Sequence, residues 1–166
     1  MIKSRPIKRN RALVQFSRDH HFGLLLVWKI RQGLRFNATP QRISDYINFF
    51  CTDYLQQHFK DEEEMLFIHL SPDDDLRLSA EKDHKLLCDL NKKIKLEPSL
   101  TSIREFADKL EQHIRFEEKF LFNHLQACIG QEQLDMIEQK MSASHHSKED
   151  GWKDIFWVKP QYSSIK

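Results

Sequence analysis

Two stretches of the chain place a glutamate four residues after a histidine. They read HFKDEEEMLFIHL from His58 and HIRFEEKFLFNHL from His113, and seven of the thirteen positions are identical. On a helix, residues i and i+4 lie on one face, so each histidine points the same way as the glutamate of its own copy, Glu62 or Glu117. Imidazole and carboxylate together suit iron and similar divalent metals. The repeated pair therefore predicts a metal site.

Chance has to be weighed against this interpretation. A chain with 9 histidines should contain about one such pair at random, given ordinary residue frequencies. A third pair, His145 with Glu149, lies in a polar stretch without helical periodicity, and we interpret it as that accident. The other two pairs differ because their surroundings repeat as well, which indicates a duplicated structural unit. Both of their glutamates fall on an apolar stripe, where burial of a carboxylate is costly unless a metal ion compensates it.

A weaker repeat supplies two more histidines. The tripeptide RDH that ends at His20 resembles KDH that ends at His84, and leucines follow both. His20 lies on the apolar stripe of its segment, so we favour it over the neighbouring His21 as a ligand. Folding the two halves around a pseudo-twofold axis would bring four imidazoles and two carboxylates together. Six ligands are too many for one tetrahedral zinc and suit two metal ions with bridging carboxylates.

The segments that carry these residues are predicted to be helical, and no segment alternates convincingly with period two. We expect four long helices and a short amphipathic one, at residues 11–36, 41–70, 79–96, 101–128 and 131–143. Thr39 and Pro40 suit the cap and first position of the second helix, and Gly130 suits the C-terminal end of the fourth. Four helices with short connections predict an all-α, up-down-up-down four-helix bundle with a short extra helix.

Composition narrows the class of protein. The chain has 166 residues, 40% apolar and 31% charged, which is typical of one globular domain. Its net charge of +1 does not favour nucleic acid or an anionic membrane as a partner. The longest apolar run, FGLLLVW, is far shorter than a membrane span of about 20 residues. We expect a basic N-terminal tail, a bundle domain and an aromatic C-terminal tail packed on the bundle, at residues 1–10, 11–143 and 144–166.

The cysteines and two further histidines are not predicted to be metal ligands. Three widely spaced cysteines, with no visible signal peptide, predict a reducing, cytoplasmic setting. Cys88 and Cys128 each follow a histidine by four residues, but buried free thiols are commoner than zinc ligands. His69 and His124 lie eleven residues beyond the repeated histidines, about 16 Å along a helix. We expect both to be partly exposed and too distant to share the metals.

The residues that ligate metal in this interpretation resemble those of the hemerythrin-like, or HHE cation-binding, family. The resemblance rests on His20, HFKDE from His58, DH ending at His84 and HIRFE from His113, and it covers roughly residues 12–140. It implies a four-helix bundle that holds a non-haem di-iron centre with an oxide or hydroxide bridge. It also implies six metal ligands, namely His20, His58, Glu62, His84, His113 and Glu117.

Two departures from the oxygen carriers of that family bear on function. Those proteins have HxxxH on the third helix, whereas Cys88 stands four residues after His84 here. They also place an aspartate five residues after the fourth-helix histidine, whereas Glu117 follows His113 by four. The resemblance therefore implies a protein that binds or senses oxygen, nitric oxide or iron, with a small diatomic ligand as partner, rather than reversible oxygen storage. It does not predict an enzyme, and it is compatible with a homodimer.

Two other functions stay open at the level of sequence. A di-iron oxidase or ferroxidase is one alternative, although ferritin-type bundles use Glu-x-x-His with a spacing of three and more carboxylates. A zinc-stabilised interaction module, whose aromatic tail meets a partner, is the other. Metal content separates them, because the main interpretation requires two irons per chain.

Overall fold

The computed structural model describes residues 8–143 and 151–161, so His145, Glu149 and most of the basic N-terminal tail lie outside it. Within these two ranges all regular structure is helical, which confirms the predicted all-α class. None of the helices described there is long and apolar enough to cross a bilayer.

The loop between the first two helices follows the cap signals in the sequence closely. Helix α1 (Arg11–Arg35) ends where Asn37 takes a left-handed backbone with φ of 57°. Asparagine tolerates this conformation better than most side chains do. Helix α2 (Pro40–Phe50) then begins with Thr39 as its cap and a proline in its first turn, as predicted. The loop between the two helices is therefore short and sharply turned.

The predicted helices 41–70 and 101–128 are interrupted by π-helical turns. After α2 the chain continues as η1, α3, η2 and the 3₁₀ turn η3, at Cys51–Leu55, Gln56–Asp61, Glu62–Leu66 and Phe67–His69. The later helix divides into α5, η4 and α6, at Leu100–Phe116, Glu117–Leu121 and Phe122–Cys128. In η2 the Phe67 N–H donates to the Glu62 carbonyl, five residues back. In η4 the Phe122 N–H donates to the Glu117 carbonyl in the same way. Single π turns of this kind are frequent at functional sites.

Two helix ends differ from the sequence prediction. Helix α4 (Asp75–Leu96) starts four residues earlier than expected, because the Asp74 carboxylate accepts the N–H groups of Leu76 and Arg77 at 3.0 Å. The fourth predicted helix ends at Cys128, as expected, but Gly130 does not take the left-handed backbone that commonly closes a helix. No described glycine has positive φ, and the Gly130 carbonyl instead accepts the first backbone hydrogen bond of α7 (Gln131–Ala143).

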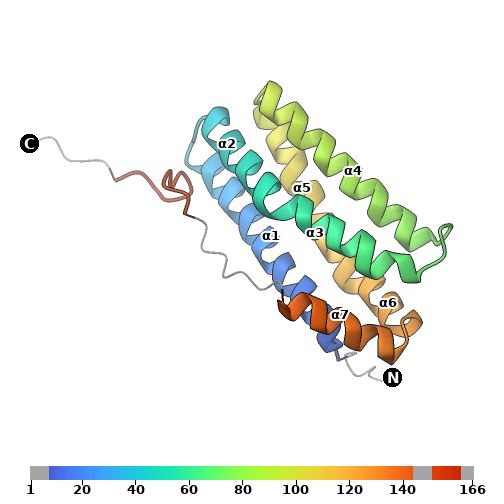
Figure 1. Ribbon diagram of the computed structural model, residues 1–166. Helices are drawn as coiled ribbons and strands as arrows, with labels where there is room; N and C mark the ends of the chain where they lie inside the picture. The colour runs from blue at the N-terminus through green and yellow to red at the C-terminus, as the bar shows by residue number, and fades with distance from the viewer. Residues whose placement is uncertain (1–7, 144–150, 162–166) are drawn as a thin grey trace, which may run out of the picture.

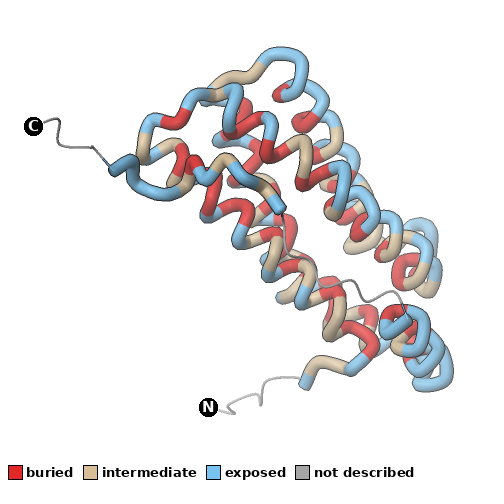
Figure 2. Tube along the Cα trace, turned by 60° about the vertical axis from the view of Figure 1, so that its left-hand side comes forward, coloured by how far each residue is buried: buried red, intermediate tan, exposed pale blue. Residues whose placement is uncertain are grey.

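The long helical segments α1, α2–α3, α4 and α5–α6 lie side by side, and α7 packs against α1 (Figure 1). Buried residues face the interior of this assembly along each segment (Figure 2). They form two apolar clusters, one containing Leu26 and the other containing Phe16. His20 stands between these two residues on α1, so this buried histidine lies between the two clusters.

The segment 151–161 lies on one of these clusters. Phe156 is 2% exposed and belongs to the cluster of Leu26. It packs so closely on Gly33 that a Cβ there would lie 2.5 Å from its ring. Arg42 also holds the segment through its guanidinium, which donates to both carboxylate oxygens of Asp154 at 2.5 and 2.9 Å.

Candidate metal centre

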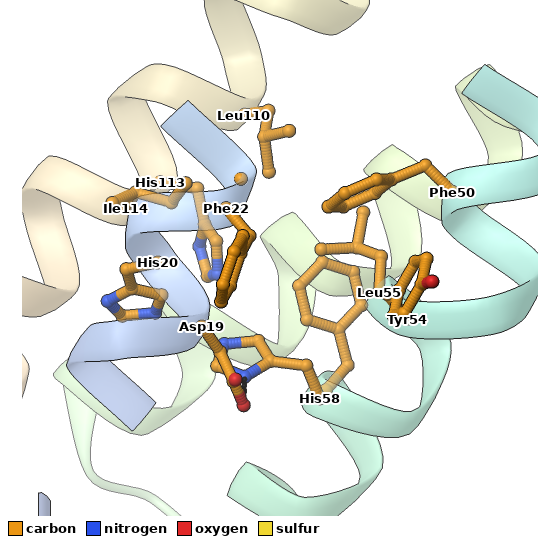
Figure 3. Close-up of a pocket in the computed structure, with 12 residues that line it drawn as sticks. Asp19, His20, Phe22, Phe50, Tyr54, Leu55, His58, Leu110, His113 and Ile114 are labelled. Atoms are coloured by element: carbon orange, nitrogen blue, oxygen red, sulfur yellow. Dashed lines mark hydrogen bonds and ion pairs between the residues drawn. The ribbon is translucent and has the colours of Figure 1, made fainter. Parts of the chain in front are cut away.

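Six polar side chains are buried at one level of the fold, and they are the six predicted ligands. They come from six different elements: His20 from α1, His58 from α3, Glu62 from η2, His84 from α4, His113 from α5 and Glu117 from η4. None is more than 6% exposed, and both glutamates are 0% exposed. Figure 3 shows three of the imidazoles, from three separate helices, around one shared space. The structure therefore brings all six together.

The imidazole Nε2 atoms surround the two carboxylates. His20 Nε2 lies 2.9 Å from Glu117 Oε2 and 3.4 Å from Glu62 Oε1. On the opposite side, His84 Nε2 lies 3.3 Å from Glu62 Oε2 and 3.6 Å from Glu117 Oε1. Each glutamate also meets the histidine of its own repeat, at 3.1 Å for His58 and 3.3 Å for His113. Each carboxylate is thus in contact with three imidazoles.

These contacts divide into two groups that share both glutamates. His20 and His58 form one group with the two carboxylates, and His84 and His113 form the other. In each group one ligand atom per residue lies within 4.8 Å of all the others. Two histidines on each side of a shared pair of carboxylates are the donors that two neighbouring metal ions would need.

A metal fits this site because its donor atoms are otherwise unsatisfied. The Nε2 atoms of all four histidines and all four carboxylate oxygens are buried without a hydrogen bond of acceptable geometry. Buried polar atoms normally have a partner, and a cluster without one calls for an ion. The donors are neutral imidazoles and carboxylates, which suit iron, zinc and related divalent metals alike.

The other nitrogen of each imidazole faces an outer carboxylate. His20 Nδ1 lies 2.7 Å from Glu118, and His84 Nδ1 lies 2.7 Å from Glu63. A third outer carboxylate, that of Asp19, lies 3.4 Å from His58 Nδ1. Such outer carboxylates fix the tautomer of a ligand histidine and raise its basicity.

The fourth outer contact is that of Asp83, 3.5 Å from His113 Nδ1. Sequence reasoning missed these four carboxylates as functional residues. Their signal was present, because the second glutamate of each EE pair and the aspartate of each DH pair repeat with the ligands. Basic side chains hold two of these four carboxylates in place. Arg9 donates to Glu118 at 3.0 Å, and the Lys109 ammonium lies 2.5 Å from Asp83.

The electrostatics favour charge at the centre. Burial would lower the pKa of His20, but the close carboxylates of Glu117 and Glu118 outweigh it and raise that pKa well above the ordinary value. For His84, the contacts with Glu117 and Glu62 likewise overcome burial and raise the pKa to about 11. Burial would raise the pKa of Glu62, yet the surrounding imidazoles hold it well below its usual range. The two buried glutamates thus favour positive charge beside them, whether on an imidazole or on a metal ion.

An apolar cavity of about 20 Å³ adjoins the centre. The imidazoles of His20, His58 and His113 form part of its wall, together with apolar residues of α1, α2 and α5 (Figure 3). The rest of the wall includes Phe22, Phe50 and several aliphatic side chains. A space of this size holds about one small molecule such as water.

The remaining histidines and the cysteines lie away from the six donors. His21 is exposed, whereas His20 is buried, which distinguishes the two candidates on α1. His69 and His124 are half-buried at helix ends, and His124 Nε2 lies 2.7 Å from the capping residue Asp74.

All three cysteines are free thiols. Cys51 is buried and Cys88 half-buried. Cys128 is exposed, so the expectation of a buried thiol was wrong for it. The last turn of α6 presents its side chain to solvent.

Comparison with known protein families shows which family the chain resembles. Residues 19–119 match the family described as Hemerythrin HHE cation binding domain. The matched range contains every one of the six buried donors. No curated protein and no solved structure shows significant similarity to the chain.

Proposed function

The chain belongs to the hemerythrin HHE cation-binding family, and from this premise we propose that it holds two iron ions and binds or senses oxygen, nitric oxide or iron. One observation carries the proposal. The six buried donors form two groups that share Glu62 and Glu117. Shared carboxylates are suited to bridging two ions, so the arrangement favours a dinuclear centre.

The donor set supports iron over zinc as the resident metal. Structural zinc prefers four ligands in a closed tetrahedron, of the cysteine and histidine type. Here four imidazoles and two carboxylates leave room for additional ligands around each ion. An iron pair would supply one- and two-electron redox chemistry and affinity for oxygen and nitric oxide. The protein's own part is to hold the imidazoles through Glu63, Glu118 and the two aspartates, and to keep bulk water out.

The apolar cavity supports a small diatomic molecule as the ligand. Its volume of about 20 Å³ is too small for a metabolite. Its wall reaches the centre through His20, His58 and His113, so a molecule in the cavity lies against the metal-binding side chains. A neutral diatomic molecule needs no polar partner in such a space.

The helix order belongs to the same proposal. We propose that α1, α2–α3, α4 and α5–α6 alternate up and down, with the bundle domain at residues 11–143. Three short connections, at residues 36–39, 70–74 and 97–99, support this order, because helices joined by short loops pack antiparallel.

Metal analysis of protein purified without oxygen tests the function. The expected result is two irons per chain and an optical spectrum that changes when oxygen or nitric oxide is admitted. Zinc alone, with no spectral change, would favour an interaction module instead. Continuous oxygen consumption on addition of ferrous iron would indicate a ferroxidase.

A further inference from the structure

Two residues that the metal centre does not use lie next to each other at the end of α6. His124 is the repeated histidine outside the six donors, and Cys128 follows it by four residues, so both lie on one face of the helix. The neighbouring residues Leu125 and Ile129 are 0% and 5% exposed and anchor this end of the helix in the core. His124 is therefore held half-buried at the edge of the fold, and the Cys128 thiol is open to solvent.

The carboxylate of Asp74 holds the imidazole of His124. Its Oδ1 accepts the N–H groups of Leu76 and Arg77 at 3.0 Å, which caps α4. Its other oxygen, Oδ2, lies 2.7 Å from Nε2 of His124. Because the cap fixes the carboxylate, Oδ2 favours the tautomer of His124 that carries its proton on Nε2. The other ring nitrogen, Nδ1, then keeps its lone pair.

The thiol of Cys128 lies beside that imidazole. Its Sγ is 3.8 Å from Nδ1 and 3.9 Å from Nε2 of His124. Of these two nitrogens, Nδ1 is the one that can take up the thiol proton, since Nε2 donates to Asp74. A nucleophile within reach of a base, with the base oriented by a third group, is the arrangement that activates a thiol. Since the thiolate is the reactive form of cysteine, the cluster of Asp74, His124 and Cys128 favours reaction at Cys128.

The other two cysteines lie in different surroundings. Cys51 is buried, and burial raises the pKa of its thiol. Cys88 is half-buried, and burial raises the pKa of its thiol as well. A thiol that stays protonated reacts slowly with electrophiles. Exposure and the neighbouring imidazole therefore distinguish Cys128 from both.

We propose that Cys128 is a site of reversible thiol–disulfide exchange with low-molecular-weight disulfides, with His124 as its base and Asp74 as the residue that positions the base. The thiol proton passes to Nδ1 of His124, and the thiolate attacks one sulfur of the disulfide. A bond forms between that sulfur and Cys128 Sγ while the original S–S bond breaks. The departing thiolate takes the proton from His124, so Cys128 is oxidised to a mixed disulfide and one small thiol is released. The exchange involves none of the six buried donors and is independent of the proposed iron centre.

The experiment is the reaction of the folded protein with dithiodipyridine, a small aromatic disulfide whose leaving group is coloured. One thiol per chain should react in a fast phase, and mass spectrometry of the peptides should find the adduct on Cys128. His124→Gln removes the base and should slow this phase about tenfold or more at pH 7. At about pH 10 a cysteine thiol, with its ordinary pKa of about 8.5, ionises without a base. The two proteins should then react at the same rate.

Asp74→Asn tests the positioning role, because asparagine keeps the helix cap but turns an amide N–H toward His124. The imidazole then carries its proton on Nδ1 and cannot accept one from the thiol, so the fast phase should slow as in His124→Gln. His69→Gln alters the corresponding histidine of the first repeat and is the matched control, which should react at the unaltered rate. Circular dichroism checks that each variant is folded.

Each outcome bears directly on the proposal. An unchanged rate at pH 7 in His124→Gln would overturn it, because the exposed thiol would then react without a base. A loss of rate that persists at about pH 10 would also overturn it, since the substitution would then restrict access to the thiol. An unaltered rate in Asp74→Asn would overturn the role of Asp74. Dithiothreitol should remove the adduct and restore the free thiol, and an adduct that resists it would contradict reversible exchange. Failure of the proposal leaves the proposed metal-binding function standing.

Discussion

The Nδ1 atom of His20 lies 2.7 Å from Oε1 of Glu118, although 98 positions separate the two residues in the chain. This contact turns the opposite ring nitrogen, Nε2, toward the buried carboxylates. Arg9 in turn donates to Glu118, so the outer carboxylate is itself held in place. Loss of such a partner changes a metal site without removing any of its ligands.

Glu118→Gln should therefore weaken metal binding by about 10- to 100-fold while all six donors stay in place. The amide keeps the size of the side chain but loses the charge that favours an N–H on His20 Nδ1. Competition with a chelator of known affinity measures the effect. Glu132→Gln, on the exposed face of α7, is the matched control, and an equal loss in both variants would contradict the role of Glu118.

His58→Ala and His113→Ala should each lose at least one metal ion per chain. Each substitution removes one imidazole from one of the two donor groups. Elemental analysis of purified protein gives the answer directly. His69→Ala alters the other repeated histidine and should keep full metal content, whereas full content in both ligand variants would refute the assignment.

Removal of metal should lower the thermal stability of the protein. A ligand that binds only the folded state stabilises it by about 2.7 kcal/mol at a free concentration one hundred times its Kd. The melting temperature should therefore fall when a chelator is added and recover when metal is restored. His58→Ala should show a smaller chelator effect, and an identical shift in that variant would argue against binding at this site.

Phe156→Ala should destabilise the protein by roughly 3 kcal/mol, because the ring is almost completely buried and its loss leaves a cavity. Chemical denaturation, with the free energy of unfolding extrapolated to water, measures this. The neighbouring Ile155 is 54% exposed, so Ile155→Ala should cost much less. Equal effects would show that the segment 151–161 contributes little through its buried ring.

The cap of α4 should make a pH-dependent contribution to stability. The Arg77 N–H, donated to the carboxylate, and the nearby His124 lower the pKa of Asp74 below its ordinary value. A lowered folded pKa stabilises the protein above the unfolded pKa of about 4, and this stability is lost as the pH falls through the folded pKa. Asp74→Ala should cost about 1 kcal/mol at pH 7 and less at pH 3. Denaturation at the two pH values tests this.

Asp74→Asn is the informative control, because asparagine caps helices well but does not titrate. It should retain most of the stability at pH 7. Its free energy of unfolding relative to Asp74→Ala should change less with pH than that of the unaltered protein. If the free energies of unfolding of Asp74→Ala and the unaltered protein differ by the same amount at every pH, the charge of Asp74 does not contribute to the cap.

Sequence reasoning was sufficient for the helical class, the family and the residues of the centre. The repeat indicated the residues of the centre, because His58 with Glu62 and His113 with Glu117 recur in matching surroundings. The ligand roles themselves stay predictions, as do the domain boundaries, the cytoplasmic location and the homodimer. The buried position of His20 and the exposed one of His21 agree with the stripe on which that choice was made.

The parts that sequence could not supply depend on tertiary structure. A π turn adds one residue to a helical turn and leaves no distinct mark in the pattern of apolar residues. The turns at Glu62 and Glu117 were therefore missed, although both begin at a predicted ligand. The contact between Glu118 and His20 joins residues from opposite halves of the chain, and only the folded arrangement makes them neighbours.

The crossed pattern of the outer carboxylates has a consequence for assembly. Glu118 supports the histidine of the first half, and Glu63 supports that of the second. A fragment ending at the connection 70–74 would keep His20 without Glu118, and its complement would keep His84 without Glu63. Neither piece alone would contain a complete ion cage, so its assembly requires both halves of the polypeptide.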